Sequence, residues 1–142
     1  MRAAVGVCRL FLGLSALGLG ACAQVGSADD EAITRRTGLT FAEHLVGGRY
    51  DQAHQMLGRE LSATWSPEKL RTRYQEMIGD GAGPIVVPGH TEHLARWPDR
   101  QAKDRGWIYV SITGTGFAEA VTVVVADEDG AARIRQLEWG RP

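Results

Sequence analysis

The sequence predicts an α+β domain in which N-terminal helices pack on one face of an antiparallel sheet of about four strands. Up to residue 79, apolar residues recur at helical spacing, and from residue 83 onward the spacing becomes that of strands rich in β-branched residues. Helices followed by a run of strands indicate a sheet formed by consecutive hairpins, with the helices on one side.

The first predicted helix begins after Ser27, a residue type that caps helices, and acidic residues 29–31 lie where they favour a helix N-terminus. Gly38 lies inside the helix and costs about 1 kcal/mol relative to alanine. We therefore expect another element to approach the helix closely at Gly38. Gly47-Gly48 ends the helix. Its apolar stripe recurs every four residues: Ile33, Thr37, Phe41 and Leu45.

Two more helices are predicted before the strands. A short one spans Asp51 to Leu57, and Leu61 and Trp65 continue the apolar pattern through a short connection. The sequence Ser66-Pro67-Glu68 then combines a capping hydroxyl, proline at the first helical position and an acid in the first turn. Gly79 ends this helix.

Four strands are predicted after Gly83, separated by turn residues. In the last strand, Ile134 has the opposite parity to Leu137 and Trp139, so a β-bulge near Arg135-Gln136 is needed to place all three on one face. The predicted segments are a strand from Ile85 that resumes after Pro88-Gly89 and continues through His93–Trp97, a loop over Pro98–Gly106, strands over Trp107–Thr113 and Ala118–Ala126, a turn over 127–130 and a strand over Ala131–Trp139.

The N-terminus has the pattern of an export signal. Arg2 and Arg9 flank the start of an apolar stretch of about a dozen residues, which is shorter than the roughly 20 needed to span a membrane. The stretch ends in Leu19-Gly20-Ala21-Cys22, which resembles the lipobox of bacterial lipoproteins. We therefore expect a lipoprotein signal peptide over 1–21, a tether over 22–31 and the folded domain over 32–142. The alternative is an ordinary signal peptide that carries a cysteine near its cleavage site.

Lipidation of Cys22 would anchor the exported chain to the cell envelope. Because Ala23 rather than aspartate follows the cysteine, resemblance to other lipoproteins implies the periplasmic side of the outer membrane in a two-membrane bacterium, and otherwise the outer leaflet of the cell membrane. Cys8 leaves with the signal, so no disulfide is expected in the mature chain. Loss of the two arginines lowers the Lys and Arg count from 16 to 14 against 17 Asp and Glu, a net charge near −3 that argues against nucleic acid as a partner.

Two long runs carry a family resemblance. FAEHLVGGRYDQAHQMLGRELSATWSPEKL, residues 41–70, and VTVVVADEDGAARIRQLEW, residues 121–139, resemble the nuclear transport factor 2-like superfamily, the ketosteroid isomerase-like cone within the cystatin-like folds. The resemblance implies a curved sheet around a long helix and a conical cavity open to solvent. The superfamily includes isomerases, dehydratases, cyclases and non-catalytic domains. No catalytic arrangement of the enzymes aligns residue by residue, so none is carried over.

Five residues are candidates for lining a pocket. His44 lies on the flank of the first helix's apolar stripe, where it could face a cavity mouth. Tyr74, Trp97, Trp107 and Tyr109 could form an aromatic wall. Ordinary packing in the core and on the sheet is the alternative explanation for all five.

The segment His90-Thr91-Glu92-His93 is the only one that suggests a metal. On a strand, positions 90 and 93 point to opposite faces, and no third ligand stands out. We therefore expect no metal and no cofactor.

These observations favour a membrane-anchored, non-catalytic binding or interaction module of the bacterial envelope, taking either a small apolar ligand in the cone or a protein partner. A homodimer through the outer sheet face is a further option that the resemblance implies. The alternative function is a cofactor-independent isomerase or hydratase that uses a polar residue in the cone.

Overall fold

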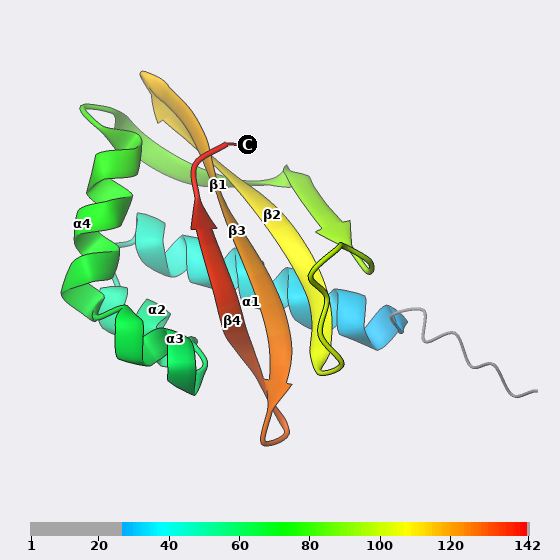
Figure 1. Ribbon diagram of the computed structural model, residues 1–142. Helices are drawn as coiled ribbons and strands as arrows, with labels where there is room; N and C mark the ends of the chain where they lie inside the picture. The colour runs from blue at the N-terminus through cyan, green and yellow to red at the C-terminus, as the bar shows by residue number, and fades with distance from the viewer. Residues whose placement is uncertain (1–26, 142) are drawn as a thin grey trace, which may run out of the picture.

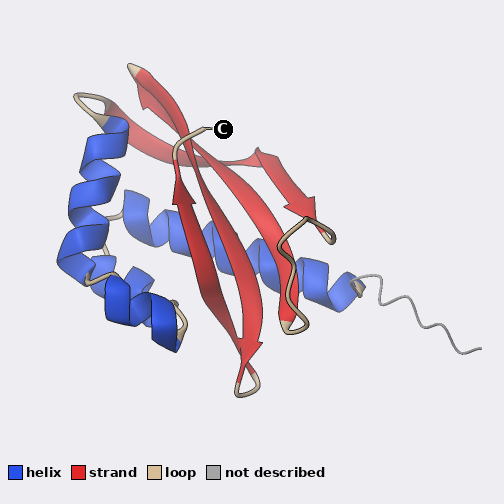
Figure 2. Cartoon of the chain, viewed as in Figure 1, coloured by secondary structure: helices blue, strands red, loops and turns tan. Residues whose placement is uncertain are grey.

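The computed structural model describes residues 27–141 and confirms the α+β class, with helices followed by an open antiparallel sheet (Figures 1 and 2). The sheet order is β1-β2-β3-β4, so each strand pairs with its neighbour in the sequence. The elements are α1 (Ala28–Val46), α2 (Tyr50–Gln55), α3 (Arg59–Thr64), α4 (Pro67–Ile78), β1 (Ala82–Leu94), β2 (Asp104–Thr115), β3 (Phe117–Glu128) and β4 (Ala131–Trp139).

Helix α1 begins and ends where the sequence predicts. The Ser27 side chain accepts a hydrogen bond from the Asp30 N–H, and Gly47 caps the C-terminus. Residues 28–31 of the predicted tether therefore belong to the helix. The expected close approach at Gly38 is also confirmed, because a Cβ there would lie 2.6 Å from Ile108 Cγ2 on β2.

The segment between α2 and α4 differs from the prediction, since residues 59–64 form the extra helix α3. Its start is fixed by β4: the Gly58 N–H donates to the Ile134 carbonyl, and the Ile134 N–H donates to the Met56 carbonyl. This parallel bridge to an edge strand is a tertiary contact, which explains why the local pattern did not reveal the helix.

The strands confirm the predicted meander with shifted ends. Strand β1 starts earlier than expected and ends at Leu94, and the loop that follows covers residues 95–103 because β2 already begins at Asp104. In β4 the register moves from Val125↔Ile134 to Val124↔Gln136, which leaves Arg135 as the extra residue of a bulge. The predicted bulge is therefore confirmed.

One face of the sheet packs on α1, and Figures 1 and 2 show no helix of residues 27–141 on the other face. Ile108, Val110 and Ile112 alternate toward α1, so Trp107 and Tyr109 point to the open face. Helices α2 and α4 pack on α1, and α3 lies against β4.

The layer between α1 and the sheet is filled. Phe41 and Leu45 of α1 and Ile108 of β2 have no accessible surface at all, and the same holds for Val121 and Ile134. A side chain with zero accessible surface borders no void large enough for a water molecule. The conical cavity that the resemblance implies is therefore not seen beside these residues.

Candidate functional site

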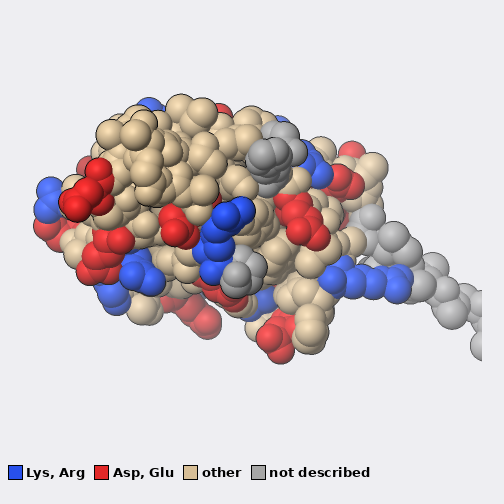
Figure 3. All heavy atoms as spheres, turned by 90° about the horizontal axis from the view of Figure 1, so that it is seen from above, with Lys and Arg blue, Asp and Glu red and all other residues tan. Residues whose placement is uncertain are grey.

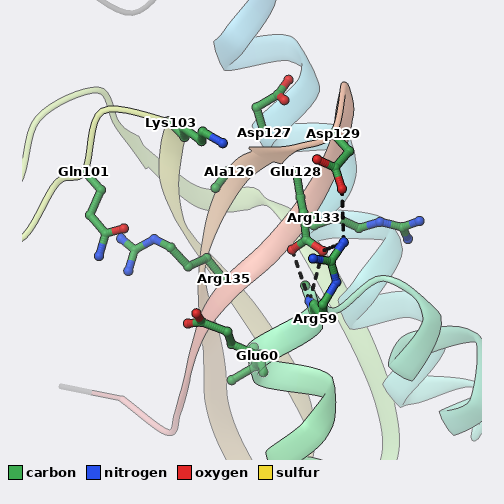
Figure 4. A pocket seen from close by; sticks show the side chains of 12 residues that line it. Arg59, Glu60, Gln101, Lys103, Ala126, Asp127, Glu128, Asp129, Arg133 and Arg135 are labelled. Carbon is green, nitrogen blue, oxygen red and sulfur yellow. Dashed lines mark hydrogen bonds and ion pairs between the residues drawn. The ribbon is translucent and has the colours of Figure 1, made fainter.

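A groove of about 340 Å³ lies on the surface where three segments meet. Figure 4 shows Gln101, Lys103 and Arg135 on one wall, and Arg59, Glu128 and Asp129 on the other. The wall with Arg135 comes from the β1–β2 loop and β4, and the opposite wall comes from the start of α3 and the β3–β4 hairpin. Leu61 and Ala126 add apolar surface. The volume is at the lower end of the range for ligand pockets.

A buried ion pair holds the first wall in place. Arg135 donates from Nε to Asp104 Oδ1 at 2.7 Å and from Nη2 to Asp104 Oδ2 at 2.6 Å. The Asp104 side chain is 0% exposed, whereas the Arg135 side chain is 25% exposed. A two-bond contact of this kind fixes the plane of a guanidinium group. The bulge that displaces Arg135 from the regular alternation thus gives the groove an arginine of defined orientation.

The same carboxylate organises the β1–β2 loop. The Gln101 N–H donates to Asp104 Oδ2 at 2.7 Å, and the guanidinium of Arg100 donates to the Asp104 carbonyl. The Lys103 carbonyl accepts from the Asp127 N–H at 2.9 Å, which ties the loop to β3. The backbone that carries Gln101 and Lys103 is therefore fixed, although both side chains are exposed.

The acidic residues of the groove are engaged by their own neighbours. Both Glu128 carboxylate oxygens accept from the Arg59 N–H, and Arg59 Nη2 lies 3.0 Å from Asp129 Oδ2. Asp127 accepts from the Gly130 N–H and pairs with Arg105, and these two contacts hold the pKa of Asp127 below its usual range.

Arg105 also connects the groove to the start of α1, since its Nη1 lies 3.0 Å from Asp30 Oδ1. Asp127 at the groove and Asp30 in the first helical turn thus share one guanidinium. The groove is therefore at the end of the domain where α1 begins.

The opposite end of the domain has a different surface. Figure 3 looks down on the end that carries the β2–β3 hairpin, where a broad area bears neither acidic nor basic side chains. Residues 81–88 of the α4–β1 connection and β1 carry no charge, and Ile85 is 60% exposed. Pro84 and Pro88 lie on this edge strand, where proline discourages pairing with another strand. An uncharged area at this end therefore lies beside charged side chains, which the same view shows around it (Figure 3).

The five predicted pocket residues do not gather at one place among residues 27–141. Tyr74 on α4 is buried in the core, where burial raises its pKa to about 12, and its ring lies 6.4 Å from that of Tyr50. Trp107 and Tyr109 lie on the open sheet face, opposite the core side. None of these three lines the groove.

The other two candidates lie elsewhere. His44 is near the end of α1, where its Nδ1 accepts from Arg49 Nε at 3.0 Å, and burial together with the Arg49 charge lowers its pKa. Trp97 is in the β1–β2 loop, with the guanidinium of Arg100 5.8 Å from its ring centre. Sequence periodicity predicts which face of an element a residue occupies, but not which faces meet.

A buried polar cluster was not anticipated from the sequence. Thr34 Oγ1 and His93 Nε2 are buried and have no hydrogen-bond partner among the described residues. Both approach Gly106 closely, at 2.7 Å and 2.5 Å from the position a Cβ would take. Burial lowers the pKa of His93, the Glu31 carboxylate raises it, and Arg35 lowers it. A hydroxyl beside a histidine and an acid suggests nucleophile chemistry, but Thr34 is 0% exposed, so no substrate reaches it.

Within the described part of the chain, no group of three or more His, Cys, Asp or Glu side chains could hold a metal ion. No helix among residues 27–141 is long and apolar enough to cross a membrane. The predicted lipidation at Cys22 lies outside the described residues, and so does the side chain of His90.

The groove was not predicted from the sequence because its walls come from three distant segments, near residues 60, 103 and 130. The one available signal was the broken alternation at Arg135, since bulges often redirect a side chain next to a functional site. When the chain is compared with family models, with curated proteins and with solved structures, none of them matches it.

Proposed function

We propose that this chain is a membrane-anchored lipoprotein of the bacterial envelope whose small α+β domain acts as a non-catalytic binding module. Its binding surface is the groove between α3, the β1–β2 loop and the β3–β4 hairpin. Of the two ligand classes expected from the sequence, the proposal favours a protein partner over a small apolar ligand in the cone.

The observation that carries this proposal is the filled layer between α1 and the sheet. Phe41, Ile108 and Val121 have no accessible surface, so an apolar ligand finds no space beside them. A general acid or base in this layer would equally lack access to a substrate, which favours binding over catalysis. The groove, in contrast, is open to solvent and has walls of fixed geometry.

The position of the groove also fits an anchored protein. Through Arg105 it is linked to Asp30, near the start of α1. Five residues, Ala23 to Ser27, separate Cys22 from α1, and five residues span at most about 18 Å. A lipid on Cys22 would therefore keep this end of the domain near the membrane, where an envelope partner can be reached.

Photo-crosslinking in the native envelope tests the binding surface. A photoreactive residue is placed at Glu60, which lines the groove, and in a matched variant at Glu76, an exposed acid on α4 outside it. We expect one discrete adduct from position 60, lost when Lys103 is changed to glutamate, and none from position 76. Equal adducts from both positions, or none from position 60, would contradict the proposal.

The anchor is tested separately by metabolic labelling with a clickable fatty acid. Wild-type protein should be labelled and fractionate with membranes, and Cys22→Ala should remove both properties. Labelling that persists in Cys22→Ala would show that the lipobox interpretation is wrong.

A further inference from the structure

The basic wall of the groove carries hydrogen-bond donors that find no acceptor among the described residues. Arg135 donates from Nε and Nη2 to Asp104, and its Nη1 has no acceptor among the described residues. Neither the Lys103 ammonium group nor the side-chain amide of Gln101 donates a hydrogen bond within residues 27–141, although the Lys103 charge helps to lower the pKa of Asp127. Both residues line the same groove. In Figure 4 the ends of Gln101 and Arg135 point toward one another on this wall.

The acceptors of the groove are, by comparison, mostly occupied. Glu128 and Asp129 contact Arg59, and Asp127 contacts Arg105 and the Gly130 N–H. Glu60 is the lining acid without a contact of this kind in the described part of the chain. The exposed donors on one wall can therefore contact a ligand group that accepts hydrogen bonds.

From these donors, which have no acceptor in the described part of the chain, we infer that the groove binds a single carboxylate through Lys103, Gln101 and the outer Nη1 of Arg135. The inference rests on the proposed function and names the chemistry of the ligand at that site. Glu60, Glu128 and Asp129 lie in the same groove, so one negative charge is tolerated better than the two of a phosphate. Leu61 and Ala126 accommodate a short apolar stem.

The small groove admits a side chain or a small acid, so two sources of the same carboxylate fit: an acidic side chain or C-terminus of a partner protein, and a free organic acid. The test uses the full chain extracted in a non-ionic detergent and observes backbone amide resonances by NMR. Butyrate is the free acid and acetyl-Ala-Glu-Ala-amide the peptide acid. Butyramide and acetyl-Ala-Gln-Ala-amide are their uncharged matches, with ionic strength held constant by chloride.

We expect saturable shifts at the amides of Gln101, Lys103 and Arg135, with a dissociation constant on the order of 10 mM for so few ligand atoms. Tighter binding of the peptide than of butyrate assigns the site to a protein acid, and the reverse order assigns it to a free acid. Lys103→Gln should weaken either probe about three- to fivefold. Lys69→Gln, which changes the other lysine of the chain and lies outside the groove, should leave affinity unchanged.

Equal shifts with the uncharged matches, absence of saturation, or tighter binding of inorganic phosphate than of either carboxylate would overturn the inference. An unchanged affinity in Lys103→Gln would overturn it as well. These failures can be distinguished from failure of the proposed function. A discrete crosslink from position 60 without carboxylate binding would support the binding surface and refute only the proposed ligand chemistry.

Discussion

Replacement of Gly38 by alanine should destabilise the domain, although helix propensity alone predicts the opposite. In an exposed helix the change would stabilise by about 1 kcal/mol. Here the new Cβ would lie 2.6 Å from Ile108 Cγ2, 3.3 Å from its Cδ1 and 3.4 Å from Val110 Cγ2. Because Cγ2 is attached directly to the Ile108 Cβ, it cannot rotate away freely. Overpacking costs about 1–3 kcal/mol and the propensity gain offsets about 1 kcal/mol of it, so we expect a net loss of up to about 2 kcal/mol.

The sign of the effect should reverse when the opposing side chain is removed. Ile108→Ala alone should cost about 2–5 kcal/mol. In that background Gly38→Ala meets no Cγ2 and should stabilise by about 1 kcal/mol. Urea unfolding followed by tryptophan fluorescence measures all four proteins, and Ala32→Gly at an exposed position of α1 calibrates the propensity term. A gain in unfolding free energy for Gly38→Ala in the wild-type background would refute the close-approach argument.

Three further predictions concern buried polar groups. Arg135→Ala should lower the free energy of unfolding by about 3–5 kcal/mol, because it leaves the buried Asp104 carboxylate without its ion-pair partner. Asp104→Ala should cost less, because the Arg135 side chain is 25% exposed. Urea unfolding that ranks the two variants the other way contradicts the assigned burial. Burial and the Arg35 charge lower the pKa of His93, and the Glu31 carboxylate opposes them. As the pH falls, His93 is therefore protonated at a higher pH in the unfolded state than in the folded state. Stability should therefore fall as the pH drops below about 6.5, and unfolding at about pH 7.5 and 5.5 should show a smaller fall in His93→Gln than in wild type. Tyr74→Phe removes a buried hydroxyl that has no hydrogen-bond partner within residues 27–141, so it should stabilise the domain by about 1 kcal/mol and raise the thermal midpoint. A lower midpoint would indicate a hydrogen bond at that oxygen.

The sequence predicted the fold class and the ends of α1, α4 and β4 because those features depend on local pattern. Ser27 and Ser66 each accept a hydrogen bond at the helix start where a cap was expected. The bulge at Arg135 followed from the parity of Ile134 against Leu137. Helix α3 was missed because its start depends on backbone bonds from β4 to residues 56 and 58.

The candidate site was less accessible to sequence reasoning. Periodicity places Trp107 and Tyr109 on one face of a strand, but it does not predict whether that face is covered. In the described part of the chain no helix covers this face, whereas Tyr74 lies in the core. The groove depends on the burial of Asp104, which holds the β1–β2 loop against β4 and places Gln101, Lys103 and Arg135 in the same groove. A contact between residues 31 positions apart leaves no periodic signal.

The central claim is that the layer between α1 and the sheet is filled, which leaves the surface groove as the place of binding. Methyl-resolved NMR under xenon pressure tests it most directly, because xenon occupies apolar cavities in proteins. We predict no saturable shift for the methyl groups of Ile108, Val110 and Val121, whose side chains have no accessible surface. Saturable shifts at these methyl groups would reveal an internal cavity, contradict the claim and favour a ligand inside the cone.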